Sequence, residues 1–142
     1  MPTGEVVAGY GFPADASSPL SDGQRRELSR IVQRARMISG YCFGVFVGPL
    51  PEGRVSAVVH HRSLPDPRSA VLVAVDPAAR AIEIVLGSTV AIDLSTRSCE
   101  LAALSMKSAF AADDLVNGLR DGVTLLAEHA RHPKVLHLDD TA

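Results

Sequence analysis

The sequence has little cysteine, no long apolar run and no surplus of basic charge, and each absence excludes a class of protein. Only two cysteines, Cys42 and Cys99, occur among 142 residues, and no Cys-x-x-Cys pair is present. This usage predicts buried cytosolic thiols instead of a disulfide framework. No apolar run reaches the roughly 18 residues that a membrane span requires, so no transmembrane segment is predicted.

Net charge and the N-terminal residues narrow the class further. The formal net charge is −2 and no basic cluster occurs, whereas a phosphate-binding surface normally carries a basic patch, so no nucleic-acid partner is predicted. The opening MPTGEVVAGYGFPADASS has neither a positively charged start nor a long apolar stretch, which argues against a signal peptide. We therefore expect a cytoplasmic protein with one hydrophobic core, for which 142 residues are sufficient.

Composition divides the chain into three parts. Residues 1–19 are predicted to form an N-terminal arm, with a possible short strand in GEVVAGY and a connector rich in glycine, proline and serine. Residues 20–131 are predicted to form the folded domain, and residues 132–142 a flexible polar tail. All the confident secondary structure therefore falls between residues 20 and 131.

Apolar periodicity predicts the order of elements in this domain. The expected order is a helix, a strand, an ambiguous piece, two strands joined by a turn, and two helices, at residues 21–39, 41–48, 55–61, 70–75, 81–86, 96–111 and 114–130. The piece 55–61 fits either a strand or a short helix. This order predicts an α/β fold, a compact three-layer helix-sheet-helix sandwich with a small mixed sheet.

Helix and turn signals support several of these boundaries. Ser21 and Gln24 have the spacing of a capping box, and Gly40 stands where a left-handed helix end is expected. Asp76 followed by Pro77 suits the first two positions of a type I turn between the two adjoining strands.

Histidine and hydroxyl residues offer little evidence of catalysis. The sequence LGSTV around Ser88 and Thr89 is not a nucleophile elbow, so a loop role is expected for Ser88. His129 and His132 lie three apart at a helix end, where both could reach one metal, and His137 follows. The zincin pattern, two histidines four apart with a glutamate between them, is absent, and a helix C-terminus favours histidine anyway.

Three acids near the predicted hairpin are the candidate metal ligands. Asp76, Glu83 and Asp93 lie in or beside it, and Ca²⁺ and Mg²⁺ prefer carboxylate and carbonyl oxygens. Because an unpaired buried carboxylate is costly, Glu83 is expected at an edge or in partial contact with solvent. Glu83 and Asp93, together with the hydroxyls of Ser88 and Thr89, are also the candidate catalytic groups.

Four segments resemble the TPM domain, and more particularly an actinobacterial branch of it of unknown function. These are SGYCFGVFVG, VLVAVDPAARAIEIVLG, MKSAFAADDL and GLRDGVTLLA. The resemblance implies a helix-sheet-helix sandwich, weak acid phosphatase activity, divalent-cation binding and assembly roles at membranes, with peripheral association with the cell envelope. It also has a departure: the family commonly has Gly-Tyr-Gly-Leu-Glu-Gly after the second strand, and here only Gly87 of that loop remains, with Thr96 near the position of a following Asp.

Two functions follow from these observations. The leading hypothesis is a non-enzymatic accessory or interaction module without a cofactor, which binds an unidentified protein partner. The alternative is a weak acid phosphatase dependent on Ca²⁺ or Mg²⁺, in which the candidate acids and hydroxyls carry the reaction. The oligomeric state is not predicted.

Overall fold

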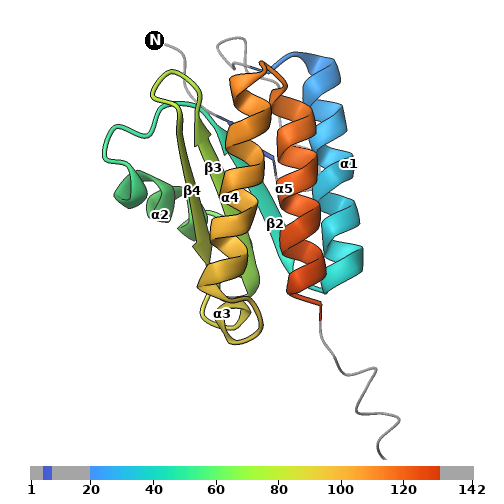
Figure 1. Ribbon diagram of the computed structural model, residues 1–142. Helices are drawn as coiled ribbons and strands as arrows, with labels where there is room; N and C mark the ends of the chain where they lie inside the picture. Colours follow the sequence, from blue (N-terminus) through green and yellow to red (C-terminus); the bar gives the residue numbers. More distant parts are fainter. Residues whose placement is uncertain (1–4, 8–19, 132–142) are drawn as a thin grey trace, which may run out of the picture.

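The computed structural model describes residues 5–7 and 20–131, which form a layered α/β fold (Figure 1). The helices are α1 (Asp22–Ser39), α2 (Arg54–Arg62), α3 (Val90–Asp93), α4 (Thr96–Ala111) and α5 (Leu115–His129), and a short 3-10 turn, η1, spans Pro67–Ser69. The strands are β1 (Glu5–Val7), β2 (Cys42–Val47), β3 (Ala70–Asp76) and β4 (Ala81–Leu86). The predicted connector and tail, with His132 and His137, lie outside the described residues.

The sheet is small and mixed, in the order β1-β2-β3-β4. Strands β2 and β3 are parallel and in register from Cys42 opposite Ala70 to Val47 opposite Val75. Strands β1 and β4 pair antiparallel with their neighbours. Every residue of β3 is buried, because helices cover both faces of the sheet, and this explains why the sequence of β3 is apolar without alternation.

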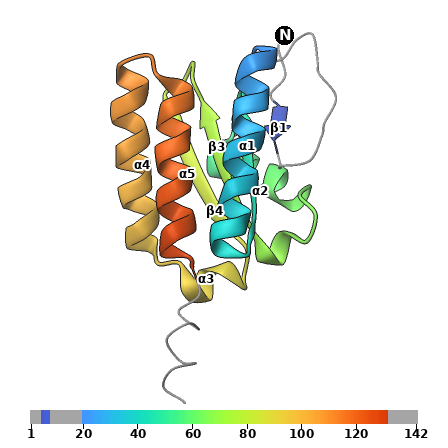
Figure 2. The same cartoon turned by 90° about the vertical axis from the view of Figure 1, so that its right-hand side faces the viewer.

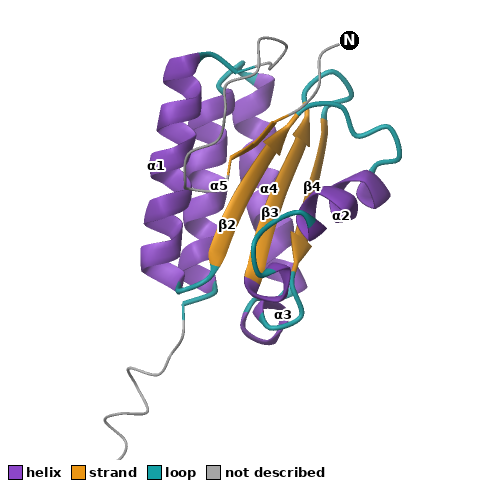
Figure 3. Ribbon diagram, turned by 180° about the vertical axis from the view of Figure 1, so that it is seen from behind, coloured by secondary structure: helices purple, strands orange, loops and turns teal. Residues whose placement is uncertain are grey.

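The two faces of the sheet carry unequal layers. Helices α1, α4 and α5 pack side by side on one face, and α2 lies on the other (Figures 2 and 3). Val45, Val73 and Ile84 of the sheet point into the core under the three long helices. On the α2 face a smaller core includes Phe46 and Leu72. The predicted three-layer helix-sheet-helix sandwich is therefore confirmed.

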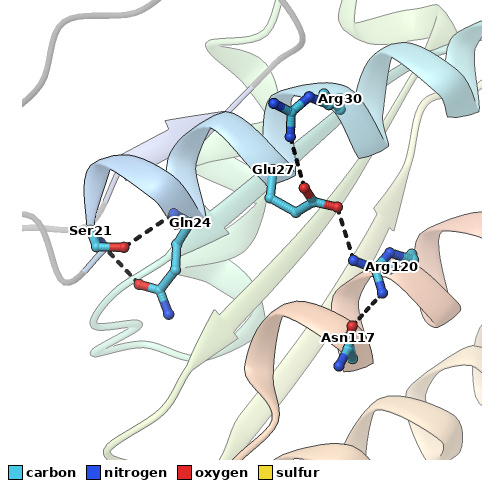
Figure 4. Close-up of polar contacts among 6 residues, drawn as sticks. All are labelled: Ser21, Gln24, Glu27, Arg30, Asn117 and Arg120. Carbon is cyan, nitrogen blue, oxygen red and sulfur yellow. Dashed lines mark hydrogen bonds and ion pairs between the residues drawn. The ribbon is translucent and has the colours of Figure 1, made fainter.

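Helix α1 begins and ends as its sequence predicts. The amide of Gln24 donates to the Ser21 hydroxyl at 3.1 Å, and the Ser21 amide donates to the Gln24 side-chain oxygen at 2.9 Å, which completes the capping box (Figure 4). Gly40 ends the helix with a φ of 85°, in the left-handed region that favours glycine.

A polar contact at the surface joins helix α1 to α5. Glu27 accepts from Arg120 of α5 and from Arg30 of its own helix, at 2.9 Å in each case (Figure 4). The hydrogen bond from Arg120 is the main cause of a lowered pKa of Glu27. Because both partners are exposed, this contact fixes orientation more than it adds stability.

Close packing explains two glycines inside α5. A Cβ added at Gly122 would lie 2.6 Å from the sulfur of Met106 in α4. One added at Gly118 would lie 2.8 Å from the Cβ of Ala109, also in α4. Helices α4 and α5 therefore approach closely enough that only hydrogen atoms fit between them at these positions.

The ambiguous piece 55–61 belongs to a helix, α2. Ala57 and His61, four residues apart, are both buried against the sheet, whereas Val55 and Val59 are exposed. Burial at helical spacing shows that the segment is a helix, so the alternative prediction of a strand is wrong. Sequence periodicity alone did not separate them, because valines occur on both the buried and the exposed side.

The structure also describes the two cysteines and the character of the helices. Both cysteines are free thiols, with Cys42 buried and Cys99 half-buried, and burial raises the pKa of each. Among residues 5–7 and 20–131, no helix combines the length and the apolar character needed to cross a bilayer.

Candidate functional site

Asp76, a predicted metal ligand, forms hydrogen bonds that hold two loops of the fold. It is buried at the end of β3, and its two carboxylate oxygens accept the backbone amides of Leu50 at 2.9 Å and Ala79 at 3.2 Å. The first bond holds the loop after β2, and the second forms the predicted turn before β4. Both oxygens therefore already have donors.

Glu83 lies where the sequence predicted, on a strand at the edge of the sheet and partly exposed. Its carboxylate pairs with Arg54, the first residue of α2, at 3.3 Å. The same guanidinium group donates to the carbonyl oxygen of Ile84 at 3.0 Å. Glu83 thus orients Arg54 along the outer edge of β4.

Asp93 belongs to α3, a short helix that the sequence analysis missed. It accepts a hydrogen bond from the hydroxyl of Tyr41, the residue before β2. Burial, and then the bond to Asp93, raise the pKa of Tyr41 to about 12. The contact fastens α3 to the beginning of the sheet.

Ser88 and Thr89 lie in the turn between β4 and α3. Ser88 is exposed, and the amide of Thr89 donates to the carbonyl of Arg68 at 3.0 Å. Gly87, just before them, has no room for a side chain, because a Cβ there would lie 2.1 Å from the carbonyl oxygen of Pro67. Packing therefore accounts for this glycine.

The structure does not bring the predicted acids together. Asp76 ends β3, whereas Asp93 contacts the beginning of β2, and the intervening strand is about 20 Å long. Among the residues that the structure describes, no three histidine, cysteine, aspartate or glutamate side chains are grouped as a metal site would require. Catalytic and metal-binding roles for Asp76, Glu83, Asp93, Ser88 and Thr89 stay predictions.

The histidines inside the described region also have separate partners. His61 is buried and its Nε2 lies 3.0 Å from the carbonyl oxygen of Ala70. His60 stacks on Phe46 with ring centroids 3.8 Å apart, and burial lowers its pKa. His129 contacts the hydroxyl of Ser98 at 2.7 Å. His60 and His61 therefore pack against the sheet, and His129 links the end of α5 to the start of α4.

A surface groove beside β4 is the first of two candidate binding sites. It has a volume of about 470 Å³ and runs between β4 and α4. Ile82, Ile84 and Leu86 form its wall on the strand, and the rest of its lining comes from helices α2, α3 and α4: Arg54, Ala91, Thr96, Cys99, Glu100 and Ala103. The groove is thus apolar along the strand and carries one charge of each sign.

The backbone of β4 beside this groove is open toward the outside of the sheet. The amide of Gly87 donates to Ala70 on β3, and antiparallel pairing alternates, so Ile82, Ile84 and Leu86 direct their backbone groups away from β3. The bond from Arg54 to the Ile84 carbonyl confirms this direction. The residues whose side chains line the groove therefore also form the outer edge of β4, with which no strand of the described part of the chain pairs.

A second hollow lies at the other end of β4. It has a volume of about 590 Å³ and is bounded by the end of β3, the turn after it and the junction of α4 with α5. Arg80, Lys107 and Asp113 are its exposed charged residues, and Phe110 and Leu115 are among its apolar ones. Glu100, Ala103, Lys107 and Phe110 follow at helical spacing, so groove and pocket share one face of α4.

Sequence reasoning missed the residues that make these hollows. Arg54, Arg80 and Lys107 are isolated basic residues in a sequence of low charge density, and nothing in their spacing marks them. The only local signal was the piece 55–61, since a helical reading would have placed Arg54 at a helix start.

Comparison with known families corrects the predicted resemblance. Residues 4–127 match the model of a family described as a domain of unknown function, DUF5130. The resemblance to the TPM domain and its actinobacterial branch is therefore wrong, and the phosphatase and membrane roles that it implied lose that support. The segments that suggested it cover β2, most of β3, β4 and parts of α4 and α5, and buried strands and helices of this kind are common to layered α/β domains. Because the match covers most of its length, this chain belongs to the DUF5130 family.

Proposed function

We propose that this protein is an interaction module that binds an extended segment of a partner protein along β4. The observation that carries the proposal is the coincidence of a free strand edge with an apolar groove at Ile82, Ile84 and Leu86. Strand addition uses these two features together: backbone hydrogen bonds give affinity, and pockets for alternate side chains give specificity. A partner segment with apolar residues at every second position fits this arrangement.

Arg54 favours a different protein over a second copy as the partner. Its guanidinium group lies on the carbonyl of Ile84, close to the middle of β4. Pairing of two β4 strands about a two-fold axis would bring two such groups together, and like charges oppose association. A partner strand that carries an acid can instead attract Arg54 and release the Ile84 carbonyl for pairing.

The same contact explains how the edge stays unpaired without a partner. Exposed strand edges promote aggregation, and a charged side chain over the edge is a common protection. Arg54 is 58% exposed and its pair with Glu83 is partly exposed, so its displacement costs about 1 kcal/mol or less. The edge is therefore covered loosely enough to be opened by a binding segment.

The alternative, a phosphatase dependent on Ca²⁺ or Mg²⁺, has less support from the described geometry. Glu83 is paired with Arg54, Asp93 accepts from Tyr41, and the two acids come from different elements. Hydrolysis of a generic phosphomonoester, 4-nitrophenyl phosphate, with each cation provides the direct check. Turnover that disappears in both Glu83→Ala and Asp93→Ala would favour the phosphatase.

Selection from a displayed library of random 12-residue peptides tests the interaction proposal. We expect enriched peptides to alternate apolar and polar residues and to contain an acid. Ala91→Glu, which places a charge in the groove at an exposed position, should weaken their binding at least tenfold. Ala78→Glu, the same change in the exposed β3–β4 turn, should leave it unchanged.

Arg54→Ala provides the second arm of this experiment. Removal of the side chain from the edge should strengthen binding of peptides without an acid, whereas Arg62→Ala at the other end of α2 should not. A library that yields no enriched peptide, or peptides that bind Ala91→Glu as well as wild type, would contradict the proposal.

A further inference from the structure

The pocket between the β3–β4 turn and the α4–α5 junction has the size and position of a ligand site. Its volume of about 590 Å³ falls within the range of roughly 300–1,000 Å³ that small-molecule sites occupy. It lies at the end of β3 where the parallel strands β2 and β3 terminate, and ligands of open α/β sheets bind at this end. In Figure 1 this is the end opposite α3.

Two basic side chains from different elements line the pocket. Arg80 comes from the turn before β4, and Lys107 from the last turns of α4. Within residues 20–131, neither side chain forms an ion pair or a side-chain hydrogen bond with another described residue. Both charges are therefore available to a ligand.

The floor between them is apolar. Val75 is buried, and Phe110 and Leu115 are half-buried. Phe110 supplies an aromatic ring, which offers a large contact area at low entropic cost. The pocket therefore suits a ligand with an apolar body and an anionic group.

Two acids in the same lining restrict the charge of that anion. Asp76 is in the wall, and its two carboxylate oxygens accept from backbone amides. Asp113 is exposed at the rim. Arg80 and Lys107 attract a dianion more strongly than a monoanion, but Asp76 and Asp113 repel it more strongly as well. With two charges of each sign in the lining, the second ligand charge brings no net attraction, and it costs more to desolvate, which favours a carboxylate.

The backbone provides a separate indication. Arg80 has a φ of 55° and Asp113 a φ of 61°, both in the left-handed region. Arginine is strained there, whereas aspartate adopts this conformation more readily. A third such residue, Asp66, lies outside the pocket. Two charged residues held in this conformation at one pocket fit the tendency of strained residues to gather at functional sites.

We propose that this pocket binds an organic monocarboxylate with an apolar body, whose carboxylate contacts Arg80 and Lys107 and whose body packs on Phe110 and Leu115. The proposal does not depend on strand addition at β4. The pocket and the groove lie at different places along β4 and α4, and they have no lining residue in common.

Phenylacetate is the probe for this proposal, with phenethylamine and phenyl phosphate as comparison ligands. Isothermal titration and amide chemical shifts of the full chain should give a dissociation constant on the order of 1 mM or tighter for phenylacetate. Shifts should centre on residues 75–80 and 107–115. Phenethylamine should not bind, and phenyl phosphate should bind more weakly because it carries more negative charge.

Charge-removing variants locate the site. Arg80→Gln and Lys107→Gln should each weaken phenylacetate binding about tenfold, and Arg62→Gln, an exposed arginine outside the pocket, should not. Arg80→Gly should weaken binding equally while its thermal midpoint stays at or above that of wild type, which separates loss of a contact from loss of the fold.

Cross-controls keep this pocket and the groove distinguishable. Ala91→Glu should leave phenylacetate binding unchanged, and Arg80→Gln should leave peptide binding unchanged. The proposal would be overturned if phenylacetate did not bind at a concentration of about 10 mM. It would also be overturned if phenyl phosphate or phenethylamine bound more tightly than phenylacetate, or if Arg80→Gln and Lys107→Gln bound phenylacetate as tightly as wild type.

Discussion

The two ends of the sheet use their polar residues differently. At the amino end, where β2 and β3 begin, Tyr41 donates to Asp93 and Ser98 contacts His129. The turn after β4 packs there against the backbone of Pro67 and Arg68. At the carboxyl end, where β2 and β3 stop, Arg80 and Lys107 line a pocket and have no ion-pair partner within residues 20–131.

The two ends therefore differ in the role of their polar groups: some are bonded inside the fold, and others are free to bind a ligand. A polar group that is bonded inside the fold costs stability when it is removed, whereas an unpaired surface charge can be removed with little effect. Asp76 shows that the division is by contacts and not by position alone, since it lies at the carboxyl end and is fully bonded. The predictions below test the two ends against each other.

The largest effect is expected at the amino end, from Gly87→Ala. A Cβ there would lie 2.1 Å from the Pro67 carbonyl oxygen and 2.3 Å from that of Arg68, and neither backbone can move without displacing the start of β3. We expect the free energy of unfolding to fall by about 4 kcal/mol, or folding to fail. Urea denaturation followed by circular dichroism measures it.

Gly23→Ala is the matched control, because a Cβ there meets nothing within 4 Å. It should raise stability by less than about 1 kcal/mol through helix propensity. Equal stabilities of the two variants would show that the amino end is not closely packed.

Tyr41→Phe should have the next largest effect, a loss of about 1–2 kcal/mol in the free energy of unfolding. The change removes the phenol that donates to Asp93 and keeps the buried ring. Unchanged stability at pH 7 would contradict a structural role for this contact.

The same residue predicts how stability depends on alkaline pH. The pKa of Tyr41 is raised to about 12, against about 10 for an unfolded tyrosine. Its contribution is therefore complete below pH 10 and is lost as the pH rises toward 12, because the unfolded chain ionises first. Urea denaturation at pH 9, 10 and 11 should show a steeper decline in wild type than in Tyr41→Phe.

At the carboxyl end, Arg80→Gly should act in the opposite direction. Relief of the left-handed backbone should raise the free energy of unfolding by up to about 1 kcal/mol. Differential scanning calorimetry would measure the gain. A loss of more than about 1 kcal/mol would show that Arg80 belongs to the structural group after all.

The smallest effects are expected for Lys107→Gln and Asp113→Asn. Both side chains are exposed and neither is hydrogen-bonded or ion-paired within the described part of the chain. Each substitution should change the free energy of unfolding by less than about 0.5 kcal/mol. A thermal-shift series with Tyr41→Phe in the same plate would place the two ends on one scale.

Much of the fold was predictable because it depends on local rules. Ser21 and Gln24 specify the start of α1 through bonds between neighbours, and Gly40 specifies its end. The run from Ala70 to Val75 predicts a central strand because a strand covered on both faces must be apolar throughout. These signals do not depend on distant parts of the chain.

The candidate sites were much less predictable. Glu83 was correctly expected at an edge, but its partner Arg54 comes from a helix that the sequence left ambiguous. Arg80 and Lys107 are separated by 27 positions and share a pocket only because β4 and α4 lie side by side. The apolar segments that suggested the TPM domain describe a core, and a core does not identify a family.

The sequence by itself determined the order of the long helices and of β2, β3 and β4, the β3–β4 hairpin and the layered α/β architecture, because hydrophobic periodicity, caps and turns act over a few residues. Only the tertiary structure decided that residues 54–62 form a helix, that Asp76 and Asp93 are used inside the fold, and that β4 is the edge strand of the sheet that residues 5–7 and 20–131 form. It also decided which charges remain available. The physical reason is that partners for polar groups are set by contacts between distant segments, which local sequence does not encode.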